Sequence, residues 1–157
     1  MMTIRKYQPT DREQCIGIFR SNCPPFLDPS ELEGLERWLN GQDRGAVVYK
    51  TSAAEYYYVG EIAGKVVACG GFYLTQEPSR AGMAWGLVHR DHHRRGLGTQ
   101  LFRYRLNEIR KGYPEIPITM DTSQHTFPFF EKMGFKVTKI KADGYGKGLD
   151  RYDMEVR

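Results

Sequence analysis

The sequence has few cysteines and no long hydrophobic run. Its three cysteines, Cys15, Cys23 and Cys69, are odd in number and lack the spacing of metal or redox motifs, so we expect free thiols in a reducing compartment. No stretch approaches the roughly 18 apolar residues of a membrane span, and the start, Met1 to Lys6, lacks the apolar core of a signal peptide. We therefore expect a cytoplasmic protein without a membrane partner.

The chain also lacks internal repeats, low-complexity segments and a strong excess of charge. A length of 157 residues with 40% hydrophobic residues predicts one globular domain over 1–157 with a sizeable core. The net charge of +4 is modest. It suits a small phosphorylated ligand as well as it suits nucleic acid.

A basic, glycine-bearing segment from Val88 to Thr99 is the most informative part of the chain. The residues before it, 83–88, have the pattern of a short buried strand, and residues 100–111 have apolar residues spaced for a helix. Gly96 and Gly98 lie in the turn between this strand and this helix. They lack a Cβ, so a ligand could approach the main chain there.

The charge of this turn adds to the same interpretation. Arg90, Arg94 and Arg95 are all close to the expected start of the helix, where amide N–H groups have no partner in the helix. Free amides and arginine side chains together are typical of a site that holds phosphate groups. The turn therefore predicts a pyrophosphate-binding site.

The remaining chain alternates strands and helices. We expect strands over 3–7, 56–62, 65–74, 83–88, 116–121, 135–141 and 149–156, and helices that begin near 10, 28, 100 and 127. Capping boxes are predicted at Thr10 to Glu13 and at Asp28 to Glu31. Gly70 and Gly71 predict a bulge or a close backbone approach within a strand.

Two motifs in order resemble the GNAT family of N-acetyltransferases. The first is Arg-Arg-Gly-Leu-Gly-Thr, residues 94–99, after a strand that ends at Val88, and the second is Phe-Phe-Glu-Lys-Met-Gly-Phe, residues 129–135. The resemblance covers the whole chain. It implies an α/β (α+β) fold with a mixed, mostly antiparallel sheet of six to seven strands and about four helices.

The resemblance implies acetyl-CoA as the acyl donor, held where the fourth and fifth strands splay apart. The pantetheine arm would pair with the backbone from Gly86 to Val88, and the pyrophosphate would take amides from Arg94 through Thr99. His93 and Ser123 stand at motif positions where the family has other polar residues. The implied cofactor-binding residues are Gly86, Leu87, Val88, His93, Arg94, Arg95, Gly96, Leu97, Gly98, Thr99, Ser123 and Phe130.

The sequence departs from the family at the residue proposed to protonate the leaving thiol. Phe130 stands where the family has a tyrosine, and phenylalanine has no proton to donate. Tyr145, in a glycine-rich loop before the last strand, is the replacement we expect, with Tyr58 as the second candidate. No carboxylate in the sequence stands out as a general base.

Several alternatives stay open at this point. A metal site at His89, His92 and His93 is not expected, because the neighbouring arginines repel a cation. A non-catalytic acyl-CoA sensor or scaffold and a nucleic-acid-binding module are the rivals to an acyltransferase. The acceptor is open among a small metabolite, an antibiotic, a polyamine, a peptide N-terminus and a protein lysine, and a homodimer is plausible from the resemblance.

Overall fold

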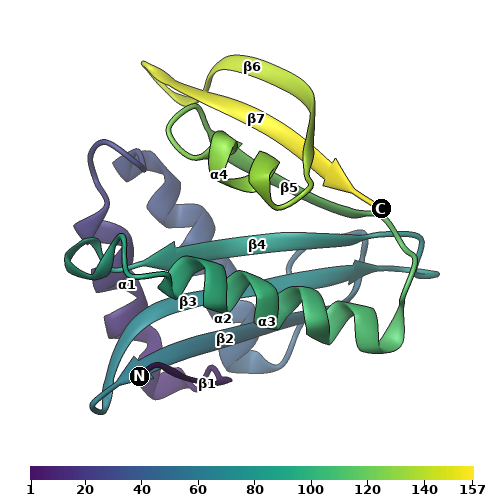
Figure 1. The fold of residues 1–157 in the computed structure, drawn as a ribbon. Coiled ribbons are helices and arrows are strands. Elements are labelled where there is room, and N and C mark those ends of the chain that lie inside the picture. Colours follow the sequence, from purple (N-terminus) through teal and green to yellow (C-terminus); the bar gives the residue numbers. More distant parts are fainter.

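The protein is built on one twisted sheet of seven strands. A computed structural model describes all residues from 1 to 157, and the strand order is β1-β2-β3-β4-β5-β7-β6. All neighbouring strands are antiparallel except β4 and β5, which are parallel (Figure 1). The predicted fold class and element order are confirmed.

The elements have the following bounds. The strands are β1 (Thr3–Lys6), β2 (Ser52–Ile62), β3 (Lys65–Thr75), β4 (Ala81–Val88), β5 (Ile118–Ser123), β6 (Lys136–Gly146) and β7 (Leu149–Val156). The α-helices are α1 (Arg12–Ser21), α2 (Leu32–Arg44), α3 (Leu97–Gly112) and α4 (Phe127–Lys132). Short 3-10 turns, η1 (Pro9–Asp11), η2 (Pro29–Glu31) and η3 (Arg90–His92), precede α1 and α2 and follow β4.

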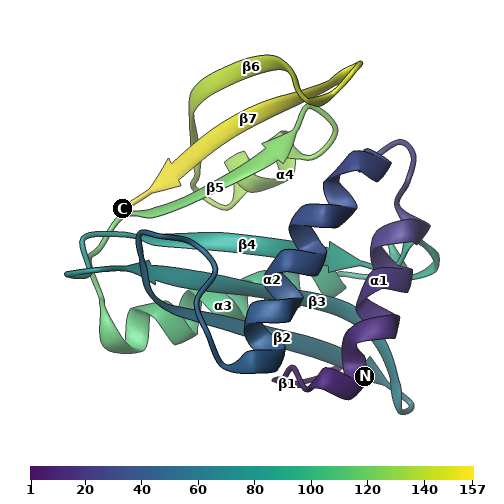
Figure 2. The ribbon, with the colours of Figure 1, turned by 180° about the vertical axis from the view of Figure 1, so that it is seen from behind.

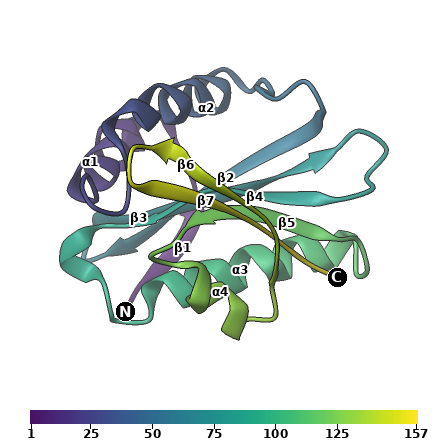
Figure 3. The ribbon, with the colours of Figure 1, turned by 90° about the horizontal axis from the view of Figure 1, so that it is seen from above.

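Helices cover both faces of the sheet and divide the core in two. Helices α1 and α2 lie on one face and α3 and α4 on the other (Figure 3). Trp38 and Phe19 are buried between the first pair and the sheet, and Phe102 and Leu101 of α3 are buried on the opposite face. Apolar residues three or four positions apart form these faces, which is why the helical pattern could be recognised. None of the helices has the length and apolar character that crossing a membrane requires.

Strands β4 and β5 part soon after they meet. They pair only through Ala81 with Ile118 and Gly82 with Thr119, although β4 continues to Val88. Figure 2 shows β5, β6 and β7 rising away from β4 as a separate wing of the sheet. The edge of β4 that faces β5 is therefore without a strand partner over most of its length.

One of the two predicted capping boxes is confirmed. Asp28 accepts a hydrogen bond from the Ser30 amide at 2.9 Å, and Glu31 accepts one from the Asp28 amide at 2.9 Å. The box predicted at Thr10 to Glu13 is wrong, because Asp11 accepts the Gln8 amide at 2.8 Å and caps the preceding 3-10 turn instead.

The last hairpin differs from the predicted loop. Strand β6 runs on through Gly146, which pairs with Leu149 across a two-residue turn, after an irregular stretch that begins at Lys141. Tyr145 is therefore a strand residue and not a loop residue. The glycines that predicted a loop allow the irregular pairing instead: a Cβ on Gly144 would lie 2.5 Å from Arg151 Cβ of β7.

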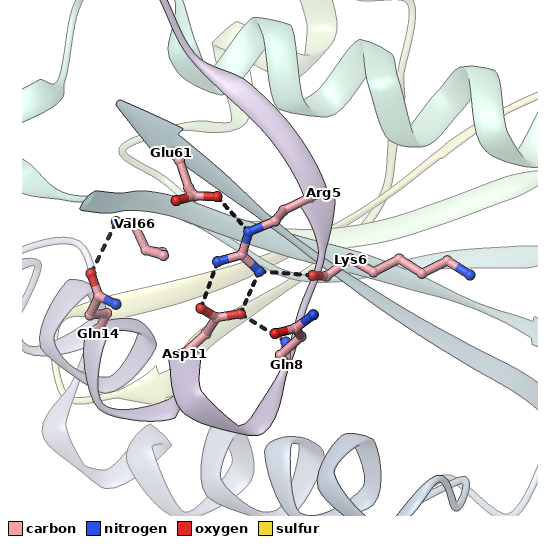
Figure 4. Close-up of polar contacts among 7 residues, drawn as sticks. All are labelled: Arg5, Lys6, Gln8, Asp11, Gln14, Glu61 and Val66. Carbon is pink, nitrogen blue, oxygen red and sulfur yellow. Dashed lines mark hydrogen bonds and ion pairs between the residues drawn. The ribbon is translucent and has the colours of Figure 1, made fainter. Parts of the chain in front are cut away.

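A charged cluster joins β1, β2 and the start of α1. Arg5 donates to both oxygens of Asp11 at 2.9 and 2.8 Å and to Glu61 (Figure 4). Asp11 is only 3% exposed, and the Arg5 guanidinium holds its pKa below the ordinary value. Nearby, Gln14 accepts the Val66 amide at 3.0 Å and ties α1 to β3. The cluster links the N-terminal edge strand to the helix that follows it.

We expect Asp11→Asn to lower the free energy of unfolding by about 2 kcal/mol at pH 7, because it removes the charge that satisfies a partly buried arginine. The lowered pKa means that the carboxylate contributes stability above its unfolded pKa of about 4 and loses it as the pH falls through the folded value. Urea unfolding at pH 7 and below pH 4 measures both effects. Glu13→Gln, on the exposed side of α1, is the control, and equal stability of the two variants would contradict the prediction.

Candidate active site

A cavity of about 1400 Å³ occupies the space where β4 and β5 part. Its walls come from β4 and β5, from the start of α3, from the connection between α1 and α2, and from the β6–β7 hairpin. Phe26 of that connection lies edge-on against His93, with ring centres 5.3 Å apart. The segments that close the cavity are therefore far apart in the sequence.

A bulge in β4 shapes the cavity wall. Cys69 pairs with Leu87 and Gly71 with Ala84, so that Trp85 and Gly86 together face the single residue Gly70 of β3. Trp85 has a φ of 50°, which is uncommon for a residue with a side chain. The Tyr57 hydroxyl donates to the Trp85 carbonyl at 2.8 Å and holds this conformation. The extra residue lies in β4 and not in β3, where the glycine pair predicted a bulge. The close backbone approach that the pair also predicted is confirmed, because a Cβ on Gly71 would lie 1.8 Å from the Tyr56 carbonyl oxygen.

The basic turn leads into α3 at the end of the cavity beyond β4. Arg94 has a φ of 65° and Gly96 a φ of 76° at the N-cap. The first bond of the helix runs from the Gln100 amide to the Gly96 carbonyl at 3.0 Å, which leaves the preceding amides of the first turn without helical acceptors. A Cβ on Gly98 would meet only Val88, at 3.7 Å. This end is a cradle of backbone donors with a positive helix terminus.

The turn is held in place by the carbonyl of Val88. Asn22 Nδ2 donates to it at 3.0 Å, and His93 Nε2 lies 2.9 Å from it, so that Nε2 carries the hydrogen. His93 was predicted as a donor to the cofactor; in the structure this nitrogen is bound to the protein instead. His89 Nδ1 accepts the Asp91 amide at 3.1 Å, and the His89 ring lies 6.2 Å from that of His92. No three histidine, cysteine or carboxylate side chains gather as metal ligands.

The structure brings together all but one of the residues predicted to bind the cofactor. Arg95 is the exception, since it is exposed and lies outside the cavity lining, while Arg94 lies within it. The lining includes Gly86, Leu87, Val88, His93, Arg94, Gly96, Leu97, Gly98, Thr99, Ser123 and Phe130.

Two of these residues have contacts of their own. Ser123 is 3% exposed, and its hydroxyl accepts the His125 amide at 3.2 Å. Phe130 packs on Phe102, with ring centres 5.0 Å apart, and so presents an apolar ring where the family motif has a phenol.

The two candidate tyrosines lie in different places. Tyr145 lines the cavity, and its hydroxyl donates to Asp121. Burial and the neighbouring carboxylate raise the pKa of Tyr145, so the phenol stays protonated at neutral pH. Tyr58 does not line the cavity: it is 4% exposed and packs between Phe72 and Tyr104 on the α3 side of the sheet. The prediction for Tyr58 is wrong, because strand alternation turns this side chain into the core.

The cavity also carries a half-buried carboxylate that the sequence did not reveal. Glu31, at the end of η2, lines the cavity beside the aromatic residues Tyr49, Tyr73 and Trp85. Burial raises the pKa of Glu31 to about 7, the hydrogen bond from the Asp28 amide opposes the shift, and the charges of Asp28 and Asp121 add to it. The capping box was the only signal at this position, and a capping role gives no reason to expect a cavity-facing carboxylate.

The charges around the cavity are unequally distributed. The start of α3 presents Arg94 and free amides, whereas Asp121 accepts a hydrogen bond from Tyr145 of the β6–β7 hairpin. Glu31 is bound to Asp28, which lies against Gly146 of the same hairpin. Arg151 partly offsets the acidic end, since its guanidinium lies 3.7 Å from Asp121 and donates to Asp153 at 2.8 Å. One end therefore suits an anion, and the other has carboxylate and aromatic groups that suit a cationic amine.

Comparisons with known proteins agree with this geometry. The family model described as an acetyltransferase (GNAT) domain matches residues 53–137, more than half of the chain. No curated protein matches the chain in sequence.

Solved structures show the same fold at low sequence identity. A GNAT-family acetyltransferase from Streptococcus pneumoniae is 17% identical with a TM-score of 0.73, and the match covers 99% of this chain and 98% of that one. The ribosomal-protein-S18-alanine N-acetyltransferase from Escherichia coli is 18% identical with a TM-score of 0.72, over 99% and 93% of the two chains. An aminoglycoside 6'-N-acetyltransferase complexed with coenzyme A is 15% identical with a TM-score of 0.71, over 98% and 96%.

Proposed function

The chain belongs to the GNAT family of acetyltransferases, and we propose that it transfers the acetyl group of acetyl-CoA directly to an amine in a ternary complex. The observation that carries the proposal is the cavity between the splayed strands β4 and β5, with the start of α3 at one end. Its volume of about 1400 Å³ is large for a single small-molecule pocket, which spans roughly 300–1,000 Å³, and suits a donor and an acceptor together.

The donor site follows from the groups that are free to bind. The amides around Gly96 and Gly98 and the side chain of Arg94 would hold the pyrophosphate. The open edge of β4 at Gly86 and Leu87 would pair with the amide groups of the pantetheine arm, as an added strand would. The Val88 carbonyl already accepts two hydrogen bonds and would serve to hold the turn.

The acceptor would enter from the acidic end of the cavity. Its amine must lose a proton before attack, and Glu31, with a pKa of about 7, is the carboxylate we assign as the proton acceptor. The nitrogen then forms a bond to the acetyl carbon and gives up its second proton to solvent. The bond from that carbon to sulfur breaks, and the sulfur leaves as a thiolate that takes up a proton. No covalent bond to the protein is needed.

Tyr145 is the group we propose to supply that last proton. The phenol lines the cavity and remains protonated because burial and Asp121 raise its pKa. In the structure the phenol donates its hydrogen to Asp121, so rotation about the C–O bond would precede donation to the thiolate. When the thiolate takes the proton of Tyr145, a phenolate remains beside the carboxylate of Asp121. A proton from solvent would then restore the phenol.

A non-catalytic acyl-CoA sensor is the second candidate, and Phe130 is the observation that favours it. The phenyl ring lies in the cavity at the position of the family's tyrosine and cannot donate a proton. A sensor binds acetyl-CoA without releasing thiol in the presence of any amine. Release of free thiol that depends on an added amine separates the two functions.

We expect Gly98→Val to weaken acetyl-CoA binding at least tenfold, because the added side chain would crowd the pyrophosphate at the helix start. The fold should persist, since a Cβ at this position meets no protein atom closer than 3.7 Å. Calorimetric titration with acetyl-CoA measures the effect. Gly17→Val, at an open position of α1, is the matched control, and wild-type affinity in a folded Gly98→Val variant would contradict the donor site.

Replacing Tyr145 by Phe should lower kcat about tenfold or more while the Kd for acetyl-CoA stays within about twofold. The ring is retained, so the change removes only the proton and its hydrogen bond to Asp121. Tyr152→Phe is the control, because Tyr152 packs on Phe127, with ring centres 4.3 Å apart, outside the cavity lining. Equal kcat in wild type and Tyr145→Phe would assign protonation of the thiolate to water.

Glu31 gives a prediction for the pH profile. A base with a pKa of about 7 must be deprotonated to act, so kcat should rise with pH and reach half of its maximum near pH 7. In Glu31→Gln this limb should disappear and the plateau rate fall about 100-fold, while the amide oxygen can still cap Asp28. Glu33→Gln, exposed in the first turn of α2, is the control. If kcat of Glu31→Gln still rises with pH as in wild type, the titrating group would be the acceptor amine and not Glu31.

A further inference from the structure

A buried arginine lies directly behind the bulge of β4. Arg105 extends from α3 to the underside of the sheet and is 5% exposed. Its Nη1 donates to the Gly71 carbonyl at 3.0 Å, whereas Nε is buried without a hydrogen-bond partner. The guanidinium lies over the ring of Phe102, 5.4 Å from its centre.

This arginine has no carboxylate partner. It takes part in none of the ion pairs of the structure. Burial lowers the pKa of Arg105 to about 10, and the neighbouring Tyr57 and Cys69 oppose the shift, so the side chain remains a cation at neutral pH. An unpaired buried charge costs stability, and folded proteins rarely keep one without compensation.

The glycines of the bulge bring this cation up to the cavity wall. A Cβ on Gly86 would lie 2.6 Å from Arg105 Nη2, and a Cβ on Gly70 would lie 3.0 Å from Arg105 Cζ. The guanidinium therefore packs against the backbone where any side chain would displace it. Gly86 itself lines the cavity, so main chain separates the cation from the proposed donor site.

The missing counter-charge fits the proposed reaction, on which this inference rests. Negative charge forms on the thioester oxygen during attack and then on the departing sulfur, beside the edge of β4 at Gly86 and Leu87. A fixed cation in a dry environment stabilises such charge without rearranging. We infer that Arg105 is a positioning residue whose charge, acting through the Gly86 backbone, stabilises the developing oxyanion and the leaving thiolate.

The test separates the charge of Arg105 from its structural contacts. Arg105→Met removes the charge, Arg105→Lys keeps it, and Arg103→Met removes a charge at an exposed position of the same helix. We expect kcat to fall about 10- to 50-fold in Arg105→Met, with the KM for acetyl-CoA within about twofold, and to recover at least in part in Arg105→Lys. Arg105→Gln, which keeps a donor for the Gly71 carbonyl, replaces the methionine variant if that variant does not fold.

A second readout does not depend on turnover. The thiol of bound CoA is titrated by the ultraviolet absorbance of its thiolate, after subtraction of the free protein. The pKa of this thiol should be about one pH unit higher in Arg105→Met than in wild type and in Arg103→Met. If wild type binds CoA but acetylates no amine, the proposed function fails and this titration still tests the inference. An unchanged thiol pKa together with wild-type kcat in Arg105→Met would overturn it.

Discussion

The parting of β4 from β5 is the constraint on which the rest of the structure depends. A sheet normally continues its hydrogen bonds from strand to strand, because unpaired backbone groups are costly when they are buried. Here pairing stops after Gly82, and the open edge of β4 faces a cavity in the middle of the sheet. Hydrogen bonds on both faces of the sheet stabilise the bulge next to this edge. Tyr57 donates to the Trp85 carbonyl on one face, and Arg105 donates to the Gly71 carbonyl on the other.

The cavity joins three parts of the chain that have separate structural roles. The start of α3 supplies free amides because every helix begins with them. The capping turn before α2 supplies Glu31, whose carboxylate also caps Asp28. The β6–β7 hairpin supplies Tyr145 and touches the same turn, where Gly146 approaches Asp28. Ordinary elements of folding thus provide the proposed donor and acceptor ends of one site.

Local features of the sequence predicted the elements well and the side-chain partners less well. The hairpin of β2 and β3, the close backbone approach at Gly71 and the glycine turn before α3 follow from patterns within a few residues. The capping box at Thr10 was wrong, because Arg5 and Gln8 compete for Asp11 from outside the helix. The end of β6 was misplaced because glycines that usually mark a loop here permit an irregular strand pairing.

The sequence by itself determined the order of strands and helices, the phosphate-type turn and the family, because these depend on short-range periodicity and on motifs of contiguous residues. Only the tertiary structure decided which polar groups share the cavity. It excluded Tyr58 and Arg95, placed Tyr145 against Asp121, and revealed Glu31 and Arg105. Decisive parts of these environments come from residues distant in the chain, such as Asp121 beside Tyr145 and the Gly71 carbonyl beside Arg105. A linear pattern carries no record of such contacts.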